Sequence, residues 1–417
     1  MPAPLPELTA WRAEARSWIA SHLPPRAGDE PSPEGRGSDA VPIFHNLSKE
    51  DESRLLDAAR AWQRIKFDAG YGAIGMPPEF GGLGLPGPYV HAYSEEESAF
   101  AAPPTGELIG VTVGLIAPTI AAYGTPEQRD TFVRAMLRTD LVACQLFSEP
   151  AAGSDLAGLT TRAVRDGDDW VINGQKVWTS GAGFADYGEL IARTDSDVPK
   201  HKGLTAFLLP MDTPGVEVRP IRQMSGGSSF YEVFFTDVRI PDSARLGAVG
   251  DGWKVALTTL GFERGNAGHR QVGATFAQLM DLARRQGRLE DPAVRGLLTD
   301  AWMESLVLDL VGQRISAANA RGESPGAAGS VRKLLWSRNL TRYAEVATAL
   351  LGSRLVADTG EWGTYAWGEH VLGAPGYRIA GGSDEIQRNI IGERVLGLPT
   401  EPRVDKDVPF SQVRRGS

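Results

Sequence analysis

The spacing of apolar residues changes twice along the 417-residue chain, near residues 140 and 250, and this constrains the fold most strongly. Before residue 138 and after residue 245 apolar residues recur at helical spacing, whereas the runs between them are typical of β-strands. Helices, then strands, then helices indicate an α+β protein, because a parallel α/β fold would alternate strand and helix. We expect an all-α domain at 1–137, a β domain at 138–245, an α-helical bundle at 246–400 and a tail at 401–417.

Local capping and turn signals support this division. Thr9 is expected to cap a first helix, and the sequence TPEQ at 125–128 predicts a capping box at the start of a later one. Asn173 and Gly174 stand between two β-like runs and predict a hairpin turn. Gly352 is expected to end a helix of the C-terminal domain.

Composition excludes several classes of function. With 43 Lys and Arg against 52 Asp and Glu, the net charge of −9 argues against a general nucleic-acid-binding protein. Cys144 is the only cysteine, so no intrachain disulfide is expected, and the six histidines lack the spacing of metal ligands. No stretch approaches the ~20 apolar residues of a membrane span, and the N-terminus lacks a secretory pattern, so we expect a cytoplasmic protein.

A glycine-rich segment at 82–87, GLGLPG, matches the pattern of a dinucleotide-binding loop. Neither a preceding strand nor a βαβ unit accompanies it, so a Rossmann domain is not expected. The absence of Walker, G-x-S-x-G and H-E-x-x-H motifs removes the commonest nucleotide-hydrolase, serine-hydrolase and zinc-protease functions.

Glu263 lies in a stretch, TLGFERGNAGHR at 259–270, that combines a helical pattern with several glycines. Its helical neighbours carry no positive charge, and the adjacent Arg264 would not face it on a helix. Each glycine costs a helix interior about 1 kcal/mol relative to Ala, so their density suggests close approach of another helix or of a ligand. The residues alone leave two interpretations open: a solvated or tertiary-paired glutamate, or the carboxylate of a functional site.

The turn at 145–155, QLFSEPAAGSD, follows a predicted strand and leads through small residues into Ser154 and Asp155. Such a turn exposes backbone N–H groups and hydroxyls, which suit phosphates and flat rings with polar edges. An ordinary Ser or Asx turn has the same pattern. Trp178, at the end of the following pair of β-like runs, is either a core residue or a wall against a ring.

These segments occur in the order and spacing of motifs in one known family. The motifs are FSEPAAGSD, VINGQKVWTSGA, FFTDVRIP, LGFERG and GGSDEIQRNIIGERVLG. They resemble the acyl-CoA dehydrogenases, and PPEFGGLG and YGTPEQRDTF are similar to the N-terminal domain of that family. The resemblance covers about residues 5–400 and implies an N-terminal helical domain, a central β-barrel-like domain and a C-terminal helical bundle.

The resemblance also implies FAD as cofactor and a set of residues around it. The residues expected to contact FAD are Gln145, Phe147, Ser148, Gly153, Ser154, Trp178, Ser180, Ser383 and Glu385. Ser154, Arg264 and Gly382 are expected near the acyl-CoA substrate. The implied reaction is α,β-dehydrogenation, in which a carboxylate removes an α-proton while the β-hydrogen leaves as hydride to the flavin.

The catalytic base is expected at Glu263. Many members of the family carry the base in a C-terminal Y-E-G-T motif, whose equivalent here is Gly381, and a glycine cannot act as a base. Other branches carry it as a Glu just before an Arg on the first helix of the C-terminal domain. That position corresponds to Glu263, followed by Arg264.

The match fails on the side that binds the ADP part of FAD. The R-x-Q-F-G segment of the family is reduced to RRQGR at 284–288, and Ala349 replaces the Gln of a Q-x-x-G-G pattern. This resembles heterotetrameric actinobacterial dehydrogenases, several of which act on sterol side-chain CoA thioesters, where a paralogous partner chain supplies the ADP contacts. A homo-oligomer with other ADP contacts, a subunit without turnover, and a same-fold flavin monooxygenase or nitroalkane-oxidising enzyme stay open. An electron-transfer flavoprotein is the expected acceptor.

Overall fold

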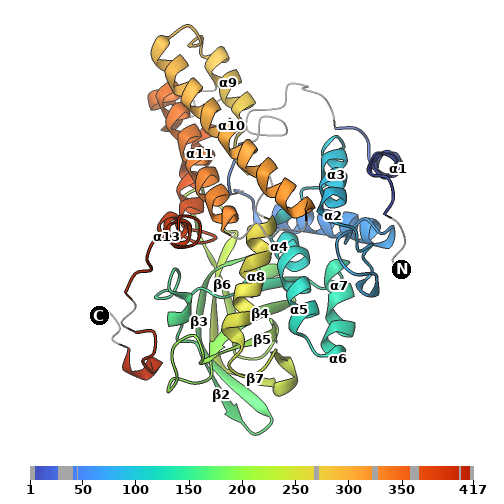
Figure 1. Cartoon of the computed structure of the whole chain (residues 1–417), viewed down its shortest axis with the longest axis vertical. Coiled ribbons are helices and arrows are strands. Elements are labelled where there is room, and N and C mark those ends of the chain that lie inside the picture. The colour runs from blue at the N-terminus through green and yellow to red at the C-terminus, as the bar shows by residue number, and fades with distance from the viewer. Residues whose placement is uncertain are drawn as a thin grey trace.

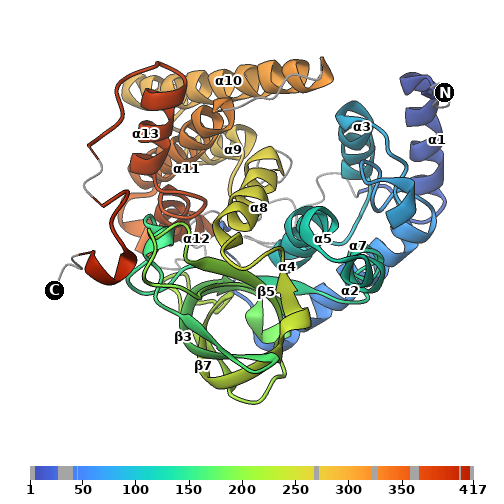
Figure 2. The ribbon, with the colours of Figure 1, turned by 60° about the horizontal axis from the view of Figure 1, so that its bottom comes forward.

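Two groups of helices flank a curled β-sheet (Figure 1). The computed structural model describes residues 5–26, 41–44, 46–266, 272–321, 327–356, 366–402 and 405–413, and only the backbone of residues 263–266, 319–320 and 366. Figure 2 shows the N-terminal and C-terminal helices standing over the sheet, with α5 and α8 between them. The predicted order of helices, strands and helices is therefore confirmed.

The N-terminal region is helical up to Leu137. Its helices are α1 (Leu8–Ala20), α2 (Lys49–Asp68), α3 (Gly87–Ser98), α4 (Gly106–Val111), α5 (Ala117–Tyr123), α6 (Pro126–Gln128) and α7 (Arg134–Leu137), with a 3-10 turn η2 (Pro78–Phe80) and two π-helical segments, η3 (Thr112–Ile116) and η4 (Arg129–Val133). The segment at 82–87 lies between η2 and α3, and no strand precedes it among the described residues, so the strand expected before a dinucleotide-binding loop is not found there.

One helix cap was predicted correctly and one was not. Thr125 and Gln128 form the expected capping box, because the Thr125 hydroxyl accepts from the Gln128 N–H and the Gln128 side chain accepts from the Thr125 N–H. The prediction of Thr9 as a cap is wrong. Glu7 is the cap of α1, because its carboxylate reaches the N–H groups of both Thr9 and Ala10.

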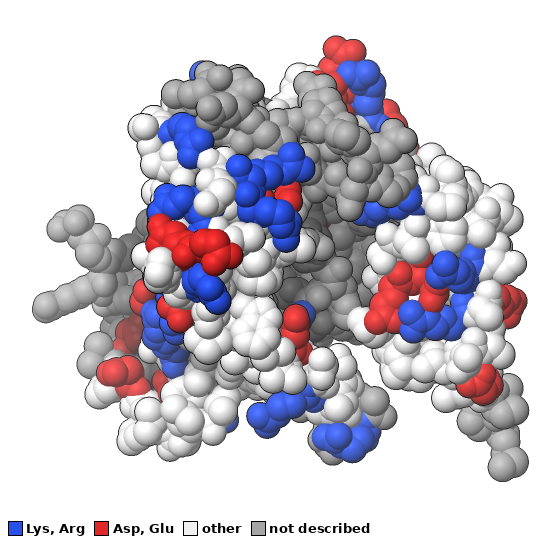
Figure 3. Space-filling view, turned by 90° about the horizontal axis from the view of Figure 1, so that it is seen from above, with Lys and Arg blue, Asp and Glu red and all other residues white. Residues whose placement is uncertain are grey.

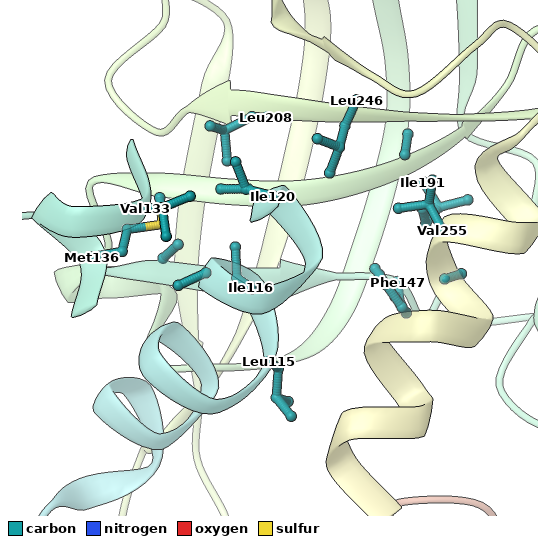
Figure 4. Close-up of a cluster of buried hydrophobic side chains, with 14 of the residues drawn as sticks. Leu115, Ile116, Ile120, Val133, Met136, Phe147, Ile191, Leu208, Leu246 and Val255 are labelled. Atoms are coloured by element: carbon teal, nitrogen blue, oxygen red, sulfur yellow. The ribbon is translucent and has the colours of Figure 1, made fainter. Parts of the chain in front are cut away.

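The helix formed by α4, η3 and α5, from Gly106 to Tyr123, is the one described segment long and apolar enough to cross a membrane. In the structure Leu115, Ile116 and Ile120 are buried in the core against the sheet (Figure 4). These contacts are those of a core helix. A buried core helix can be as long and as apolar as a membrane-spanning helix.

The central region is a single mixed sheet that curls on itself (Figure 2). Its strands are β1 (Ala143–Leu146), β2 (Arg162–Asp166), β3 (Asp169–Ser180), β4 (Tyr187–Arg193), β5 (Leu204–Pro210), β6 (Val216–Ile221), β7 (Phe230–Pro241) and β8 (Arg245–Leu246), with 3-10 turns η5 (Leu156–Gly158), η6 (Ala182–Phe184) and η7 (Asp242–Ala244). The strand order is β6-β7-β3-β2-β4-β5-β8, and β1 pairs with β4 in parallel.

The predicted hairpin turn at Asn173 and Gly174 is wrong. β3 runs without a break through both residues, and the hairpin turn lies earlier, where Asp166 of β2 pairs with Asp169 of β3. A Cβ on Gly174 would lie 2.5 Å from the Thr161 hydroxyl, so the glycine is required by close packing and not by a turn. The Asn173 side chain is bonded across the sheet to β7.

The C-terminal region is helical again from Gly252. Its helices are α8 (Gly252–Asn266), α9 (Phe276–Arg285), α10 (Pro292–Ala320), α11 (Ala328–Leu351), α12 (Ala366–Gly373) and α13 (Asp384–Arg394), with 3-10 turns η8 (Gly352–Val356), η9 (Ala374–Arg378) and η10 (Phe410–Gln412). Gly352 ends α11 as predicted. The boundaries predicted for the three domains stay predictions.

The C-terminal tail folds back onto the β domain. The Phe410 N–H donates to the Val198 carbonyl at 2.9 Å, and the buried Phe410 ring lies 3.4 Å from the Arg193 guanidinium. Figure 3 views the ends of the two helix groups and shows acidic and basic residues interspersed around a hollow between them. Among the described residues of that face neither sign of charge dominates, so their charge does not mark a docking surface.

Candidate active site

A buried ion pair holds the end of β1 against β3. The Lys176 ammonium, with 0% of its side chain exposed, donates to the Phe147 carbonyl and to the Glu149 carboxylate, both at 2.9 Å. The Val177 N–H donates to the Ser148 carbonyl at 2.9 Å. Ser148 is therefore held in place, because Lys176 bonds to both of its chain neighbours, Phe147 and Glu149.

The Glu149 carboxylate accepts three further hydrogen bonds. The N–H and hydroxyl of Thr160 donate to one oxygen at 2.7 and 2.8 Å, and the N–H of Thr161 donates to the other at 2.8 Å. Burial alone would raise the pKa of Glu149, but attraction to Lys176 and these hydrogen bonds lower it to about 2. Burial lowers the pKa of Lys176 to about 8, which is above neutrality, so the pair is ionised at pH 7.

Trp178 is not a core residue. Its side chain is 59% exposed, and its φ of +60° lies in the left-handed region, which costs a non-glycine residue ~1–2 kcal/mol. This backbone conformation accompanies a register shift between β3 and β7, from Lys176 to Thr179, and turns the indole out of the sheet. Phe230 contacts the indole edge to face at 6.2 Å. The exposed indole is available as a wall against a planar ligand.

The segment after β1 is a tight turn. Glu149 and Ala152 exchange two backbone hydrogen bonds at 3.1 and 3.0 Å, which leaves Gly153 and Ser154 exposed beyond the turn. A Cβ on Gly153 would meet nothing within 4 Å, so open space surrounds it. The predicted turn is thus present and accessible, and its role in binding a ligand stays a prediction.

The loop at 381–382 has no side chain that could act as a base. Gly381 and Gly382 have φ of +65° and +87°. Their carbonyls accept from the Gln387 side chain at 3.0 and 3.2 Å, and the Lys333 ammonium donates to the Gly382 carbonyl at 2.7 Å. Ser383 then caps α13 by accepting from the Ile386 N–H at 3.3 Å, so its hydroxyl is engaged within the chain.

Helix α8 packs on the face of the sheet to which Phe147 and Ile191 project. Val255 of α8 is buried in one cluster with Phe147 and Ile191 (Figure 4). The backbone is helical through residues 263 and 264. The side chains of Glu263 and Arg264 lie outside the described set.

Comparison with known proteins identifies the family. Family models for the acyl-CoA dehydrogenase N-terminal, middle and C-terminal domains match residues 40–140, 144–238 and 250–396. The chain is 38% identical over 404 residues to acyl-CoA dehydrogenase IpdE1 of Mycobacterium tuberculosis, covering 95% of this chain and 99% of that protein. The chain belongs to the acyl-CoA dehydrogenase family. These enzymes are flavoprotein oxidoreductases of lipid metabolism, and their cofactor is FAD.

Solved structures of the family share the whole fold. The Tcur3481-Tcur3483 steroid acyl-CoA dehydrogenase superposes with a TM-score of 0.74 at 27% identity, covering 96% of this chain and 100% of that one. The ChsE4-ChsE5 complex from Mycobacterium tuberculosis gives a TM-score of 0.71 at 27% identity, with the same coverage. The chain therefore resembles the steroid branch of the acyl-CoA dehydrogenases. The two solved structures named above are complexes of two different chains.

The residues near β1 fit the ring of FAD. The Gln145 amide nitrogen and the Thr179 hydroxyl are buried and have no hydrogen-bond partner among the described residues. Unpaired buried polar atoms are rare and indicate a missing ligand or water. Two such atoms near an outward-facing indole suit a planar ring with polar edges, and flavin is such a ring.

Among the described residues, the region expected to bind the ADP part of FAD offers fewer free polar groups than the region near β1. Arg284 and Arg285, in the segment that matches the degraded R-x-Q-F-G motif, both bond to Asp281 of their own helix, at 3.0 and 2.7 Å. Ala349 and Ser353, from the second degraded pattern, lie on either side of the C-terminus of α11. The arginines are thus engaged locally.

Sequence reasoning missed Glu149, Lys176 and Glu189 as buried charged or ionisable residues. The strand patterns could have indicated two of them, Lys176 and Glu189. Lys176 continues the alternation of buried Trp170 and Ile172 along β3, and Glu189 interrupts a strand buried on both faces. Nothing comparable marks Glu149, because its donors come from the later loop at 160–161.

Proposed function

We propose that this chain catalyses α,β-dehydrogenation of an acyl-CoA thioester to the trans-2-enoyl-CoA, with Glu263 as the base. The substrate loses its α-proton to the Glu263 carboxylate and its β-hydrogen with both bonding electrons, so that a carbon–carbon double bond forms. FAD, when bound, supplies the hydride acceptor. Because FAD is the cofactor of the family, the remaining question is which residue takes the proton.

The observation that carries the proposal is the position of α8 together with the glycine at 381. α8 packs on the sheet face that includes Phe147, and residue 263 continues that helix. The alternative base position, Gly381, has a left-handed backbone and no side chain. A proton acceptor facing a ring held at β1 is therefore expected from α8.

The other predicted site residues have the following proposed roles. Trp178 flanks the ring, Ser148 and Gln145 meet its polar edge, and Phe147 and Ser180 complete the surface beneath it. Gly153 and Ser154 lie by phosphate or acyl-CoA, as do Arg264 and Gly382, and Ser383 and Glu385 lie by the cofactor. Ser383 already caps α13, so its contribution would be through the position of that helix terminus.

The test is product formation by Glu263→Gln with FAD bound and an acyl-CoA panel that includes steroid-derived thioesters. Removal of the general base is expected to lower the rate of enoyl-CoA formation by ~10²–10⁴-fold. Glu217→Gln is the matched control, because the Glu217 side chain is 59% exposed on β6 and pairs only with Arg219 in the described structure. A rate for Glu263→Gln within about threefold of the control would reject Glu263 as the base.

We further propose that the chain works in an assembly with a second acyl-CoA dehydrogenase chain. Five apolar side chains, 42–50% exposed, form one stripe on α10: Trp302, Met303, Leu306, Val307 and Leu310. A stripe of this size on one helix is typical of an interaction surface. The heteromeric relatives and the engaged arginines of α9 support a paralogous partner that completes the ADP site.

Flavin content separates the kinds of assembly. A colourless chain that gains flavin only on co-expression with a paralogous chain supports the shared site. One FAD per chain in the isolated protein supports a homo-oligomer. If Glu263→Gln in such a pair leaves turnover intact, the chain is a subunit without turnover of its own. An electron-transfer flavoprotein as acceptor and a cytoplasmic location stay predictions.

A further inference from the structure

A buried chain of hydroxyls ends on a carboxyl group beneath α8. The Thr259 hydroxyl on α8 donates to one oxygen of Glu189 in β4 at 2.7 Å. The Thr259 hydroxyl also lies 3.0 Å from the Thr119 hydroxyl of α5. All three side chains are buried, with 0% of each residue exposed. One carboxyl group thus joins the sheet to both helices that cover it.

The second oxygen of Glu189 has no hydrogen-bond partner in the part of the chain that the structure describes. Gln145, its partner in the parallel pairing of β1 and β4, has a buried amide nitrogen that is likewise unpaired there. Partners in a ladder project to the same face of the sheet, so both unpaired atoms lie on the side covered by α8. Gln145 is partly exposed, whereas Glu189 is fully buried.

The surroundings of Glu189 hold it uncharged. Burial raises its pKa to about 8, and this outweighs the hydrogen bond from Thr259, which lowers it. The described groups facing it are Thr259 of α8, Thr119 of α5, Gln145 of β1 and Leu208 of β5, none of which is charged. A neutral carboxyl costs far less to bury than an ionised one, and through its hydrogen bond it can fix two elements at a set separation.

The anchored position on α8 lies one helical turn before residue 263. We propose that Glu189 is a positioning residue for the reaction, which through Thr259 sets the distance between residue 263 on α8 and the sheet edge at Gln145 and Ser148. This rests on the proposed function, in which Glu263 is the base. A displacement of ~1 Å at a reacting group can lower a rate by ~100-fold, so an anchor one turn away is well placed to control it.

The test compares variants that keep or remove the hydrogen bond, in the FAD-loaded protein with whatever partner chain it requires. Glu189→Leu and Thr259→Val remove it, whereas Glu189→Gln and Thr259→Ser keep it. We expect Glu189→Leu and Thr259→Val each to lower the rate of flavin reduction by ~10–100-fold, with KM and flavin content little changed. The double variant should be no slower than the slower single variant, because both remove the same contact. Glu217→Leu, on the exposed face of β6, is the control substitution.

The pH profile adds a readout that a purely structural role would not move. In the wild-type protein the rate should fall as pH rises through about 8, because a buried charge on Glu189 without a counter-charge destabilises the packing of α8 on the sheet. In Glu189→Gln, with no ionisable group at this position, that fall should be lost while the rate at neutral pH stays within about threefold of wild type. If Glu189→Gln slows the reaction as much as Glu189→Leu, proton transfer and not position is required, and the inference is wrong.

The outcomes distinguish this inference from the proposed function. If Glu263→Gln is inactive but Glu189→Leu and Thr259→Val react at the wild-type rate, only the positioning role fails. If Glu263→Gln remains active, the proposed base is wrong whatever the Glu189 variants do. If Glu189→Leu does not fold, the Thr259→Val and Thr259→Ser pair decides, since equal rates for these two would overturn the inference.

Discussion

Glu149, just after β1, and Glu189, in β4, are both buried carboxyl groups of one sheet, but their partners differ. Glu149 accepts from Lys176 and from three donors in the 160–161 loop, and its pKa is lowered to about 2. Glu189 accepts from a single hydroxyl, and its pKa is raised to about 8. Similar burial therefore gives opposite charge states, decided by the number and charge of the donors.

The difference corresponds to two tasks at one site. The ionised pair of Glu149 and Lys176 bonds three segments rigidly at the edge where the ring of FAD is expected. The neutral Glu189 bridges the sheet to a packed helix without placing a charge beneath it. In this chain the side on which the flavin ring is expected is held by an ionised pair, whereas the side beneath α8 is uncharged, and substitutions should separate the two.

The largest expected effect is that of Lys176→Met. Removal of the ammonium leaves Glu149 buried without its counter-charge, which should lower the free energy of unfolding by about 3–5 kcal/mol. Urea denaturation of the wild-type and variant proteins measures the loss. The double variant Glu149→Gln, Lys176→Met should lose less, because no charge is left uncompensated, and a loss below ~1 kcal/mol in Lys176→Met would mean that the pair is not desolvated.

Opposite pH dependence is the next expectation. The raised pKa of Glu189 means that its stabilising neutral form is fully present below pH 4.5 and is lost as pH rises through about 8. The melting temperature of Glu189→Gln should therefore rise relative to wild type between pH 5 and pH 8. The lowered pKa of Glu149 gives the reverse, stability present above pH 4.5 and lost as pH falls through about 2. Thermal melts of both glutamine variants across this range check the signs, and parallel curves would contradict the assignment.

Removing one hydrogen-bond donor should lower the free energy of unfolding more at Glu189, which has one donor among the described residues, than at Glu149, which has four. Thr160→Val removes one donor from Glu149, which keeps three others, and should cost about 1 kcal/mol. Thr259→Val removes the only donor that Glu189 has among the described residues, and should cost about 2 kcal/mol. Denaturation at pH 7 compares the two. A larger loss for Thr160→Val would remove the contrast between the carboxyl groups.

The sequence predicted those parts of the molecule that depend on neighbouring residues. Apolar spacing identified the three regions, and the capping box at Thr125 and Gln128 was confirmed. The turn prediction at Asn173 and Gly174 was wrong because the sequence Asn-Gly is the same whether the glycine serves a turn or close packing. Here the glycine is required by its contact with Thr161, which is distant in the sequence. Thr9 failed as a cap because α1 begins at Leu8 with Glu7 as its cap, so that Thr9 lies within the first turn of the helix.

The site was only partly visible in the sequence. Motifs indicated the ring side, and the exposed, left-handed Trp178 could not be told from a core tryptophan because its conformation comes from a register shift against β7. The bonds of Glu189 to α8 and of Glu149 to the 160–161 loop join residues distant in the chain. No local pattern contains such pairings.

The central claim is that Glu263 takes the α-proton, and deuterium exchange at the substrate α-carbon tests it most directly. With FAD-loaded protein and an acyl-CoA in heavy water, exchange reports proton removal separately from electron transfer to any acceptor. We predict rapid exchange with wild type and a loss of ~10²–10⁴-fold in Glu263→Gln, with Glu217→Gln unchanged. Exchange at the wild-type rate in Glu263→Gln would contradict the account and assign the proton to another group.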